Sequence, residues 1–315
     1  MDEHYKNIAK RIRGPLAPIM VPLKENDEID HDALGKWINW MADEKIPVFW
    51  MTAGTTEMRN GLSEAEVFAV TKTVAEANRG RSFFIAGTPG HWPVAKCIEY
   101  VRFAKQQGAD AAMPHLDWNE SPTNDDVERF YGAIAESSDL PLLAYTLLRP
   151  GLPVDLMVKL IQRFPQFVGI KNDTDDLYTQ TAYLTAAPPE FAAITGGMQR
   201  PFLLGSLFGQ KCYADSFAMY APYIAKSLFD HVVSGHLGEA VRIIKQYEFP
   251  MAELTFLGKH RIESKAMAKT ILWLTGHFPT NRVRFPLTTL KPDGPEVVLI
   301  RQFLDQVRIP IAVKG

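Results

Sequence analysis

Short apolar runs alternate with helical patterns along most of the chain. The runs lack the apolar–polar alternation of a half-buried strand, so they predict parallel strands that are buried on both faces. Loops rich in Gly, Pro, Thr or Asp follow them, and Ser63 with Glu66 three positions on forms a capping box for one of the helices. The eight predicted strands cover residues 16–21, 47–52, 83–87, 110–113, 142–145, 168–171, 192–195 and 212–214.

Eight strands that each lead into a helix predict an α/β fold of the closed (β/α)8 TIM barrel type. A doubly wound sheet would alternate in the same way, but its phosphate fingerprint G-x-G-x-x-G is absent from the sequence. We expect residues 1–228 to form the barrel that carries the active site and 229–315 to form a C-terminal helical extension. Within the extension a break is expected between Pro286 and Pro295, and Arg308 to Val313 is a strand candidate.

Composition and charge exclude several classes of protein. A length of 315 residues with 46% apolar and 22% charged residues suits a globular core of barrel size. The net charge of −2 argues against a nucleic-acid or anionic-membrane partner, since both bind basic surfaces. A charged N-terminus and the lack of a long apolar run predict neither a signal peptide nor a spanning helix. The two cysteines, Cys97 and Cys212, suit a reducing cytoplasm, where we expect the protein.

Lys171 is notable because it ends the apolar run that begins at Val168. Active sites of (β/α)8 barrels lie at the carboxyl ends of the strands, so Lys171 falls on the catalytic face. A lysine there can form a Schiff base with a substrate carbonyl. Its ammonium can also simply extend to solvent at the rim of the barrel, and this stretch by itself favours that alternative.

Other predicted strand ends carry groups that could share a site with Lys171. Tyr145 ends the neighbouring fifth strand and could relay protons, although buried tyrosines are more often structural. The loop Ala53-Gly-Thr-Thr-Glu57 could bind a carboxylate through its hydroxyls and backbone N–H groups, or could only cap a helix. Arg149 could clamp a carboxylate or be a solvated loop charge.

Five segments resemble, in the same order, motifs of the dihydrodipicolinate synthase/N-acetylneuraminate lyase family. They are GTTEMRNGLSEAE, AGTPG, GADAAMP, LPLLAYTLLRPG and FVGIKNDTDD, and the resemblance spans residues 14–225. It implies a (β/α)8 barrel with C-terminal helices that assembles as a homotetramer, a dimer of dimers. It also implies a class I aldolase that binds pyruvate or another 2-oxo acid as a lysine imine and uses no cofactor.

The resemblance also implies roles for individual residues. Lys171 resembles the imine-forming lysine and Tyr145 the proton-relay tyrosine, while Thr55 and Thr56 match the pair that holds the 2-oxo acid carboxylate. Further substrate contacts are implied for Arg149, one position out of register with the family's arginine, for Gly197 in the turn that resembles G-x-D, and for Tyr213 through its backbone carbonyl.

The sequence departs from the family pattern around the second substrate. Glu57 replaces a glycine, and Leu116 replaces the tyrosine that completes the proton relay of the synthase. Thr146 replaces an asparagine, and the turn Gly196-Gly197 lacks the aspartate. His115 could carry some of the proton traffic, because the unperturbed pKa of histidine is about 6.5, or it could be structural. These departures argue against dihydrodipicolinate synthase activity itself.

We therefore expect a Schiff-base-forming lyase that makes or breaks a C–C bond between a 2-oxo acid and an aldehyde. A 2-oxo-3-deoxy sugar acid dehydratase of the same family is an alternative, and so is a non-catalytic protein that binds a 2-oxo acid. The expected partners are these small molecules, with neither nucleic acid nor membrane. No metal site is expected, because the five-residue spacing of His231 and His236 does not place two imidazoles on one helical face.

Overall fold

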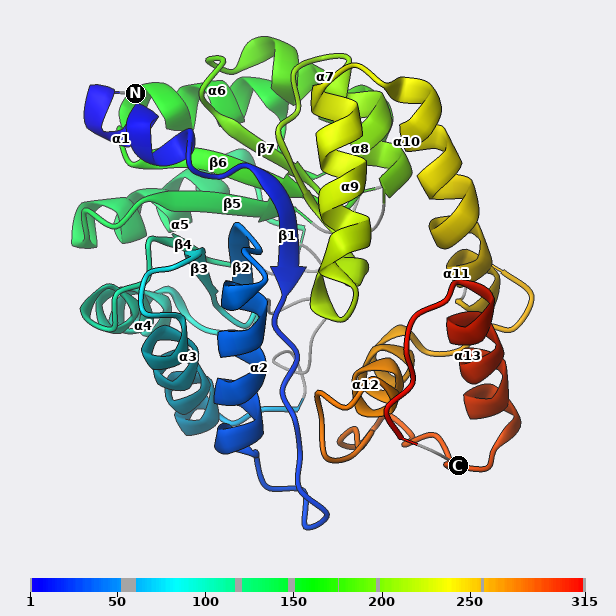
Figure 1. Cartoon of the computed structure of the whole chain (residues 1–315). Coiled ribbons are helices and arrows are strands. Elements are labelled where there is room, and N and C mark those ends of the chain that lie inside the picture. Colours follow the sequence, from blue (N-terminus) through cyan, green and yellow to red (C-terminus); the bar gives the residue numbers. More distant parts are fainter. Residues whose placement is uncertain are drawn as a thin grey trace.

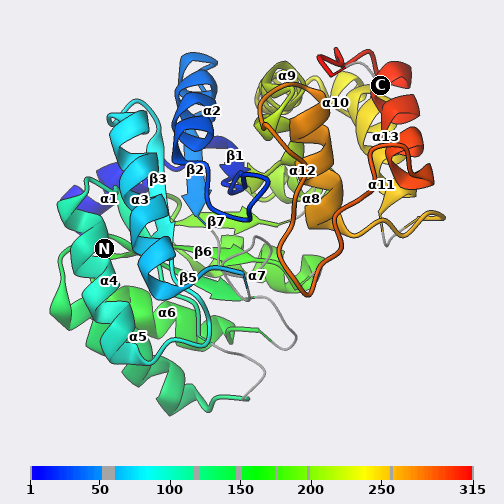
Figure 2. The same cartoon turned by 90° about the horizontal axis from the view of Figure 1, so that it is seen from below.

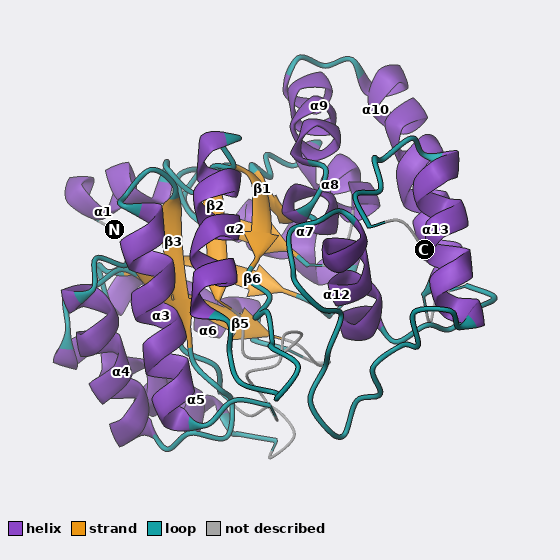
Figure 3. Ribbon diagram, turned by 60° about the horizontal axis from the view of Figure 1, so that its bottom comes forward, coloured by secondary structure: helices purple, strands orange, loops and turns teal. Residues whose placement is uncertain are grey.

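Eight parallel strands close into a barrel in which each strand pairs with the next and β8 returns to β1. The structure is a computed structural model that describes residues 2–51, 61–116, 121–146, 151–174, 176–196, 199–255 and 258–313. Helices surround the strands in Figures 1 and 3, so the predicted (β/α)8 TIM barrel is confirmed. The strands are β1 (Gly14–Pro18), β2 (Val48–Met51), β3 (Phe83–Gly87), β4 (Ala111–Met113), β5 (Leu142–Thr146), β6 (Phe167–Asn172), β7 (Ala192–Thr195) and β8 (Cys212–Ala214).

Two of the barrel helices begin at capping boxes. The predicted capping box of Ser63 and Glu66 starts α3, and Thr123 with Asp126 forms a second one at the start of α5. The helices are α1 (Glu3–Ala9), α2 (His31–Asp43), α3 (Glu64–Asn78), α4 (Val94–Gln106), α5 (Asn124–Ser137), α6 (Val154–Arg163), α7 (Leu177–Ala186) and α8 (Gln199–Ser206). A short 3-10 helix, η3 (Ser216–Met219), follows β8.

Successive strand residues pack into two different cores. In β2, Trp50 packs in the barrel interior, whereas Phe49 packs between the strands and the surrounding helices. The N-terminal segment closes one end of the interior, where Ala9 and Ile12 join the interior cluster. Tyr5 of α1 donates a hydrogen bond to the carbonyl of Asp139, just before β5, at 2.9 Å. The N-terminal segment therefore closes the end of the barrel at which the strands begin. Active sites of this fold lie at the other end, where the strands finish.

The C-terminal part is helical, as predicted. It comprises α9 (Pro222–Val233), α10 (Leu237–Ile243), the π-helical turn η4 (Ile244–Glu248), α11 (Phe249–Leu254), α12 (Ser264–Leu274) and α13 (Pro295–Gln306). Figure 2 shows α10 to α13 grouped on one side of the barrel. The domain boundary at residue 228 stays a prediction, and α9 runs through that position. In the part of the chain that the structure describes, no helix is long and apolar enough to cross a membrane.

The prediction of a strand from Arg308 to Val313 is wrong. The structure assigns no strand to residues 308–313. The backbone N–H groups of Ala312 and Val313 instead donate to the carbonyl of Leu274, at 2.8 and 3.2 Å. Leu274 is the last residue of α12, and its carbonyl has no partner within the helix. The apolar tail therefore caps a helix and pairs with no strand.

Arg284 joins the segment between α12 and α13 to the start of α3. Its guanidinium donates to both carboxylate oxygens of Glu66, at 2.9 and 2.7 Å, and to the carbonyl of Gly61 at 2.6 Å. Hydrogen bonds from Arg284 and then from Ser63 lower the pKa of Glu66 to about 2, against the opposing effect of burial.

Replacing Arg284 with glutamine should lower the free energy of unfolding by about 1 kcal/mol, the scale of a well-aligned but partly exposed ion pair. A lowered folded-state pKa stabilises only where the carboxyl is ionised, so the wild-type advantage should be complete above pH 4.5 and should shrink as the pH falls towards about 2. Urea denaturation of both proteins across this range measures the difference. A difference that does not change with pH would contradict the assignment.

Candidate active site

A β-bulge in β6 turns Lys171 into the barrel. Two consecutive residues of β5, Leu142 and Leu143, pair with residues of β6 that are two positions apart, so Val168 is an extra residue. One extra residue reverses the inward–outward alternation of the strand beyond it. The bulge thereby brings Lys171 opposite Tyr145, whose side chain belongs to the interior cluster.

Lys171 is buried among aromatic and charged partners. The residue is 1% exposed, and its ammonium lies 4.3 Å from the centre of a Trp50 ring and 5.0 Å from that of the Tyr145 ring. Aromatic faces attract a cation at such distances. Both carboxylate oxygens of Asp173 also accept hydrogen bonds from the ammonium. The alternative of a lysine that extends to solvent at the rim is therefore wrong.

Asp173 connects the lysine to the tyrosine. The hydroxyl of Tyr145 donates to Asp173 Oδ2 at 2.9 Å, and the backbone N–H of Asp173 donates to the carbonyl of Thr146 at 2.9 Å. Gly196 leaves room for this carboxylate, because a Cβ at that position would lie 1.3 Å from Asp173 Oδ1. The same Cβ would lie 2.9 Å from Lys171 Nζ. Lys171, Asp173 and Tyr145 thus form one continuous polar group at the strand ends.

Asp173 and Trp50 are not among the site residues expected from the sequence. Asp173 is two positions after Lys171, and residues two apart in an extended chain point to the same side, so this spacing could have identified it. Trp50 is buried in the barrel interior, where its ring lies against the ammonium of Lys171. Its indole Nε1 is buried and has no hydrogen-bond partner in the described part of the chain.

His115 lies beside the same tyrosine. Its ring centre is 4.8 Å from that of Tyr145, in an edge-to-face arrangement. The residue is buried, and its backbone N–H donates to Thr88 Oγ1 at 2.9 Å. Gly90 leaves room for the ring of His115, because a Cβ at position 90 would lie 2.8 Å from His115 Nδ1. The structure therefore brings His115 together with Tyr145.

The side chain of Tyr213 faces away from the barrel interior. Its hydroxyl donates to the carbonyl of Ala225 in α9 at 2.8 Å, and its ring stacks on Phe202 of α8. Tyr213 can therefore serve the site through its backbone, as the resemblance implies. The remaining predicted site residues, and Glu57, lie outside the described residues; the predicted site residues are Thr55, Thr56, Arg149 and Gly197.

A second buried carboxylate, Asp215, lies just beyond β8. It accepts hydrogen bonds from the Phe217 N–H at 2.9 Å and from Gln199 Nε2 at 3.1 Å, and burial raises its pKa to about 6. Gln199 also joins it to Glu248 of η4, a fully buried carboxylate that accepts the N–H groups of Gln199 and Arg200 at 2.9 Å each. The C-terminal helices are thus anchored to the start of α8.

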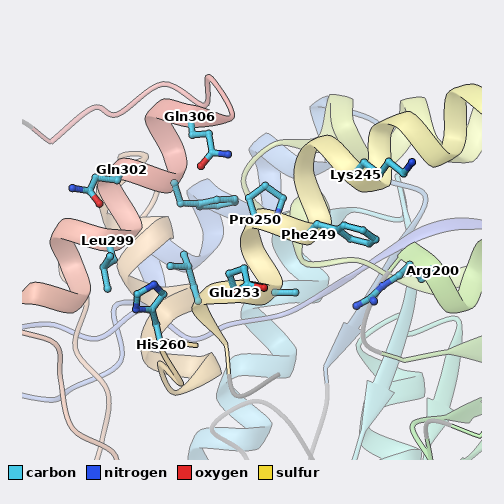
Figure 4. Close-up of a pocket in the computed structure, with 12 residues that line it drawn as sticks. Arg200, Lys245, Phe249, Pro250, Glu253, His260, Leu299, Gln302 and Gln306 are labelled. Carbon is cyan, nitrogen blue, oxygen red and sulfur yellow. The ribbon is translucent and has the colours of Figure 1, made fainter. Parts of the chain in front are cut away.

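A cavity of about 800 Å³ lies among η4, α11 and α13 (Figure 4). The side chains that line it include Arg200, Lys245, His260, Gln302 and Gln306. No lining residue belongs to a barrel strand, so this cavity is separate from the site around Lys171. Among the described residues, no three His, Cys, Asp or Glu side chains lie together as a metal site.

The fold and the site define a (β/α)8-barrel protein with a buried lysine, Lys171, near the end of the sixth strand. The profile of the Dihydrodipicolinate synthetase family matches residues 11–298, and the chain belongs to this family. The resemblance read from the motifs is thereby confirmed, and so is the prediction of an enzyme of the lyase type.

Individual relatives agree with this assignment. The 4-hydroxy-tetrahydrodipicolinate synthase of Rhodospirillum centenum is 30% identical over 239 residues, which cover 73% of this chain and 79% of that protein. The synthase of Albidiferax ferrireducens is 28% identical over 289 residues, or 90% and 93% of the two chains. The crystal structure of dihydrodipicolinate synthase from Aquifex aeolicus has a TM-score of 0.84 at 22% identity, covers 96% of this chain and 100% of that one, and supports the fold.

Replacing Asp215 with asparagine should remove a pH-dependent loss of stability. A carboxyl whose folded-state pKa is raised from 3.8 to about 6 favours the unfolded chain as the pH rises through this window, by about 3 kcal/mol at its upper end. The variant should therefore gain stability relative to the wild type between pH 4 and 6, with a constant advantage above. Chemical denaturation at a series of pH values tests this, and an equal difference at every pH would refute it.

Proposed function

We propose that this enzyme is a Schiff-base-forming lyase of the class I aldolase type that acts on pyruvate or another 2-oxo acid. The observation that supports it most is the environment of Lys171, an amine buried at the catalytic end of the barrel between Trp50 and Tyr145. Removing an ammonium from water costs several kcal/mol unless it is paired, and functional sites are where such a cost is retained.

In the proposed reaction, the amine of Lys171 attacks the carbonyl carbon of the 2-oxo acid and water leaves. The resulting protonated imine withdraws electrons from the adjacent carbon, which allows the bond to the aldehyde carbon to break or form. Tyr145 passes a proton to or from the aldehyde oxygen. The imine on Lys171 supplies the electrophile, so we propose that the reaction uses no cofactor.

The remaining roles follow the family resemblance. Thr55 and Thr56 would hold the carboxylate of the 2-oxo acid, and Arg149 a distal anionic group. Gly197 and the backbone of Tyr213 would frame the imine. Trp50 adds a donor of its own, because its buried Nε1 has no partner within the described ranges and can donate to a substrate oxygen.

The second candidate is the activity for which the relatives are named, 4-hydroxy-tetrahydrodipicolinate synthase. We favour a different second substrate, because Leu116 has no proton to pass where the synthase relies on a tyrosine. His115 packs against Tyr145 instead. Making or breaking a C–C bond to an aldehyde is the reaction that we propose, and dehydration of a 2-oxo-3-deoxy sugar acid is the alternative. A protein that only binds the 2-oxo acid would form the imine without turnover.

We further propose that the chain assembles as a homotetramer in the cytoplasm. Large apolar side chains are exposed on the neighbouring helices α7 and α8 and just beyond α8, including Tyr178 at 89% and Leu207 at 64%. Such a patch is typical of an interaction surface. Cys97 and Cys212 are both buried and unbridged, which suits a reducing compartment.

Reduction with sodium borohydride in the presence of pyruvate should attach the reduced 2-oxo acid to Lys171, as detected by peptide mass spectrometry. Lys269 is an internal control, since it is equally buried but belongs to α12 and donates to the carbonyl of Arg282. An unmodified Lys171 across a panel of 2-oxo acids would exclude the proposed chemistry.

Replacing Tyr145 with phenylalanine should leave the trapping of pyruvate measurable but slow turnover by at least about 100-fold, the usual contribution of a positioned acid or base. Steady-state assays with a panel of aldehydes and sugar acids identify the second substrate and provide this comparison. Equal turnover of the Y145F variant and the wild type would remove the tyrosine from the mechanism.

Replacing Leu207 with aspartate should convert the assembly to smaller species, measured by sedimentation velocity, because a charge is costly in an apolar contact. Replacing Val298 with aspartate is the matched control, since Val298 is also exposed but lies on α13. A wild-type monomer, or an L207D protein that sediments as the wild type does, would contradict this assembly surface.

A further inference from the structure

Asp173 has no role in the mechanism described so far, yet it contacts both of the groups proposed to react. Its two carboxylate oxygens accept hydrogen bonds from the ammonium of Lys171. One of them, Oδ2, also accepts a hydrogen bond from the hydroxyl of Tyr145 at 2.9 Å. The amine that would attack the substrate and the hydroxyl that would carry protons therefore share a single acceptor.

The surroundings of Asp173 fix its carboxylate in this position. Its backbone N–H is bonded to the carbonyl of Thr146 in β5, and its carboxylate occupies the space that the absent side chain of Gly196 leaves. The polar residues on either side of it face another network. Asn172 donates to Gln180 at 3.2 Å and accepts from Thr174 Oγ1 at 2.9 Å. Asp173 is thus the member of this segment that is directed at the amine.

An ammonium is not a nucleophile, so a resting ion pair needs a route by which Lys171 loses its proton. We propose that Asp173 is a catalytic residue, the base that takes a proton from Lys171 and then serves as the counter-ion of the imine. This inference rests on the proposed function and adds to it the carboxylate of Asp173, which directly follows β6.

The proposed steps balance in protons and charge. Asp173 accepts one proton from the ammonium, which leaves a neutral amine and a carboxylic acid. The amine nitrogen bonds to the carbonyl carbon of the 2-oxo acid, and the former carbonyl oxygen leaves as water. The two hydrogens of this water are the two protons that the nitrogen gives up, and they reach the oxygen through Asp173 and Tyr145. The product is a protonated imine with the Asp173 carboxylate ionised again, so no proton is exchanged with solvent overall.

A purely electrostatic role for Asp173 has the opposite consequence. Burial disfavours the charged form of a lysine, and a neighbouring carboxylate counteracts this effect. If Asp173 did no more than pair with the ammonium, its removal would leave a larger fraction of neutral amine, and imine formation would be as fast as before or faster. If Asp173 is the base, its removal slows the reaction even though the amine is less protonated. The sign of the change therefore separates the two roles.

The experiment measures the rate of borohydride trapping at saturating pyruvate in the full-length protein. Replacing Asp173 with asparagine, which has nearly the same shape, should slow trapping by at least about 100-fold. Replacing Asp176 with asparagine is the matched control, since Asp176 caps α7 through the Tyr178 N–H and asparagine caps equally well. The D176N variant should be trapped at the wild-type rate.

A second variant, Asp173→Ala, tests whether a carboxylate at this point is sufficient. The truncated side chain leaves space for formate, so added formate should raise the trapping rate of D173A at least about 10-fold in a saturable way and leave that of D173N unchanged. Circular dichroism shows whether each variant retains the wild-type fold.

The outcomes distinguish this inference from the proposed function. A D173N variant that is trapped within threefold of the wild type, or faster, overturns the base role alone, and so does a D173A variant that does not respond to formate. A wild-type protein that pyruvate and borohydride do not modify at Lys171 overturns the proposed function and this inference together.

Discussion

The site depends on the ion pair between Lys171 and Asp173, enclosed in the barrel. An ammonium removed from water costs several kcal/mol, and one carboxylate with two aromatic faces offsets this cost. Removing Asp173 would leave the buried amine without its counter-ion and favour its neutral form. The same pair that makes the lysine tolerable in the fold also determines where its proton can go, so stability and the proposed reactivity are linked at one contact.

Several features of the fold serve this pair. The bulge at Val168 sets the face on which Lys171 lies, and the missing side chain of Gly196 gives Asp173 its space. The N-terminal segment closes the opposite end of the barrel interior. The C-terminal helices hold α8 through Glu248, between β7 and β8. Residues that are distant in the sequence therefore determine the surroundings of Lys171 and Asp173.

Local patterns predicted the strands, the capping box at Ser63 and the helical C-terminal part, because these follow from apolar periodicity and backbone hydrogen bonding. The spacing of Lys171 and Asp173 places both side chains on one side of the strand, but that this side is the barrel interior depends on the bulge at Val168 and on the space at Gly196. The prediction of a strand from Arg308 to Val313 was wrong for a similar reason. Its apolar residues suited a strand equally well, and tertiary contact with the end of α12 decided the outcome. The choice of second substrate rests on loops whose geometry a periodic pattern does not encode.

The crystal structure of the protein after reduction with pyruvate and borohydride tests the role of Lys171 and Asp173 together. We expect a covalent bond from Lys171 Nζ to the second carbon of the pyruvate. We also expect the Asp173 carboxylate to lie within hydrogen-bond distance of both that nitrogen and the Tyr145 hydroxyl. An unmodified lysine, or an Asp173 side chain turned away from the reduced imine nitrogen, would contradict these roles.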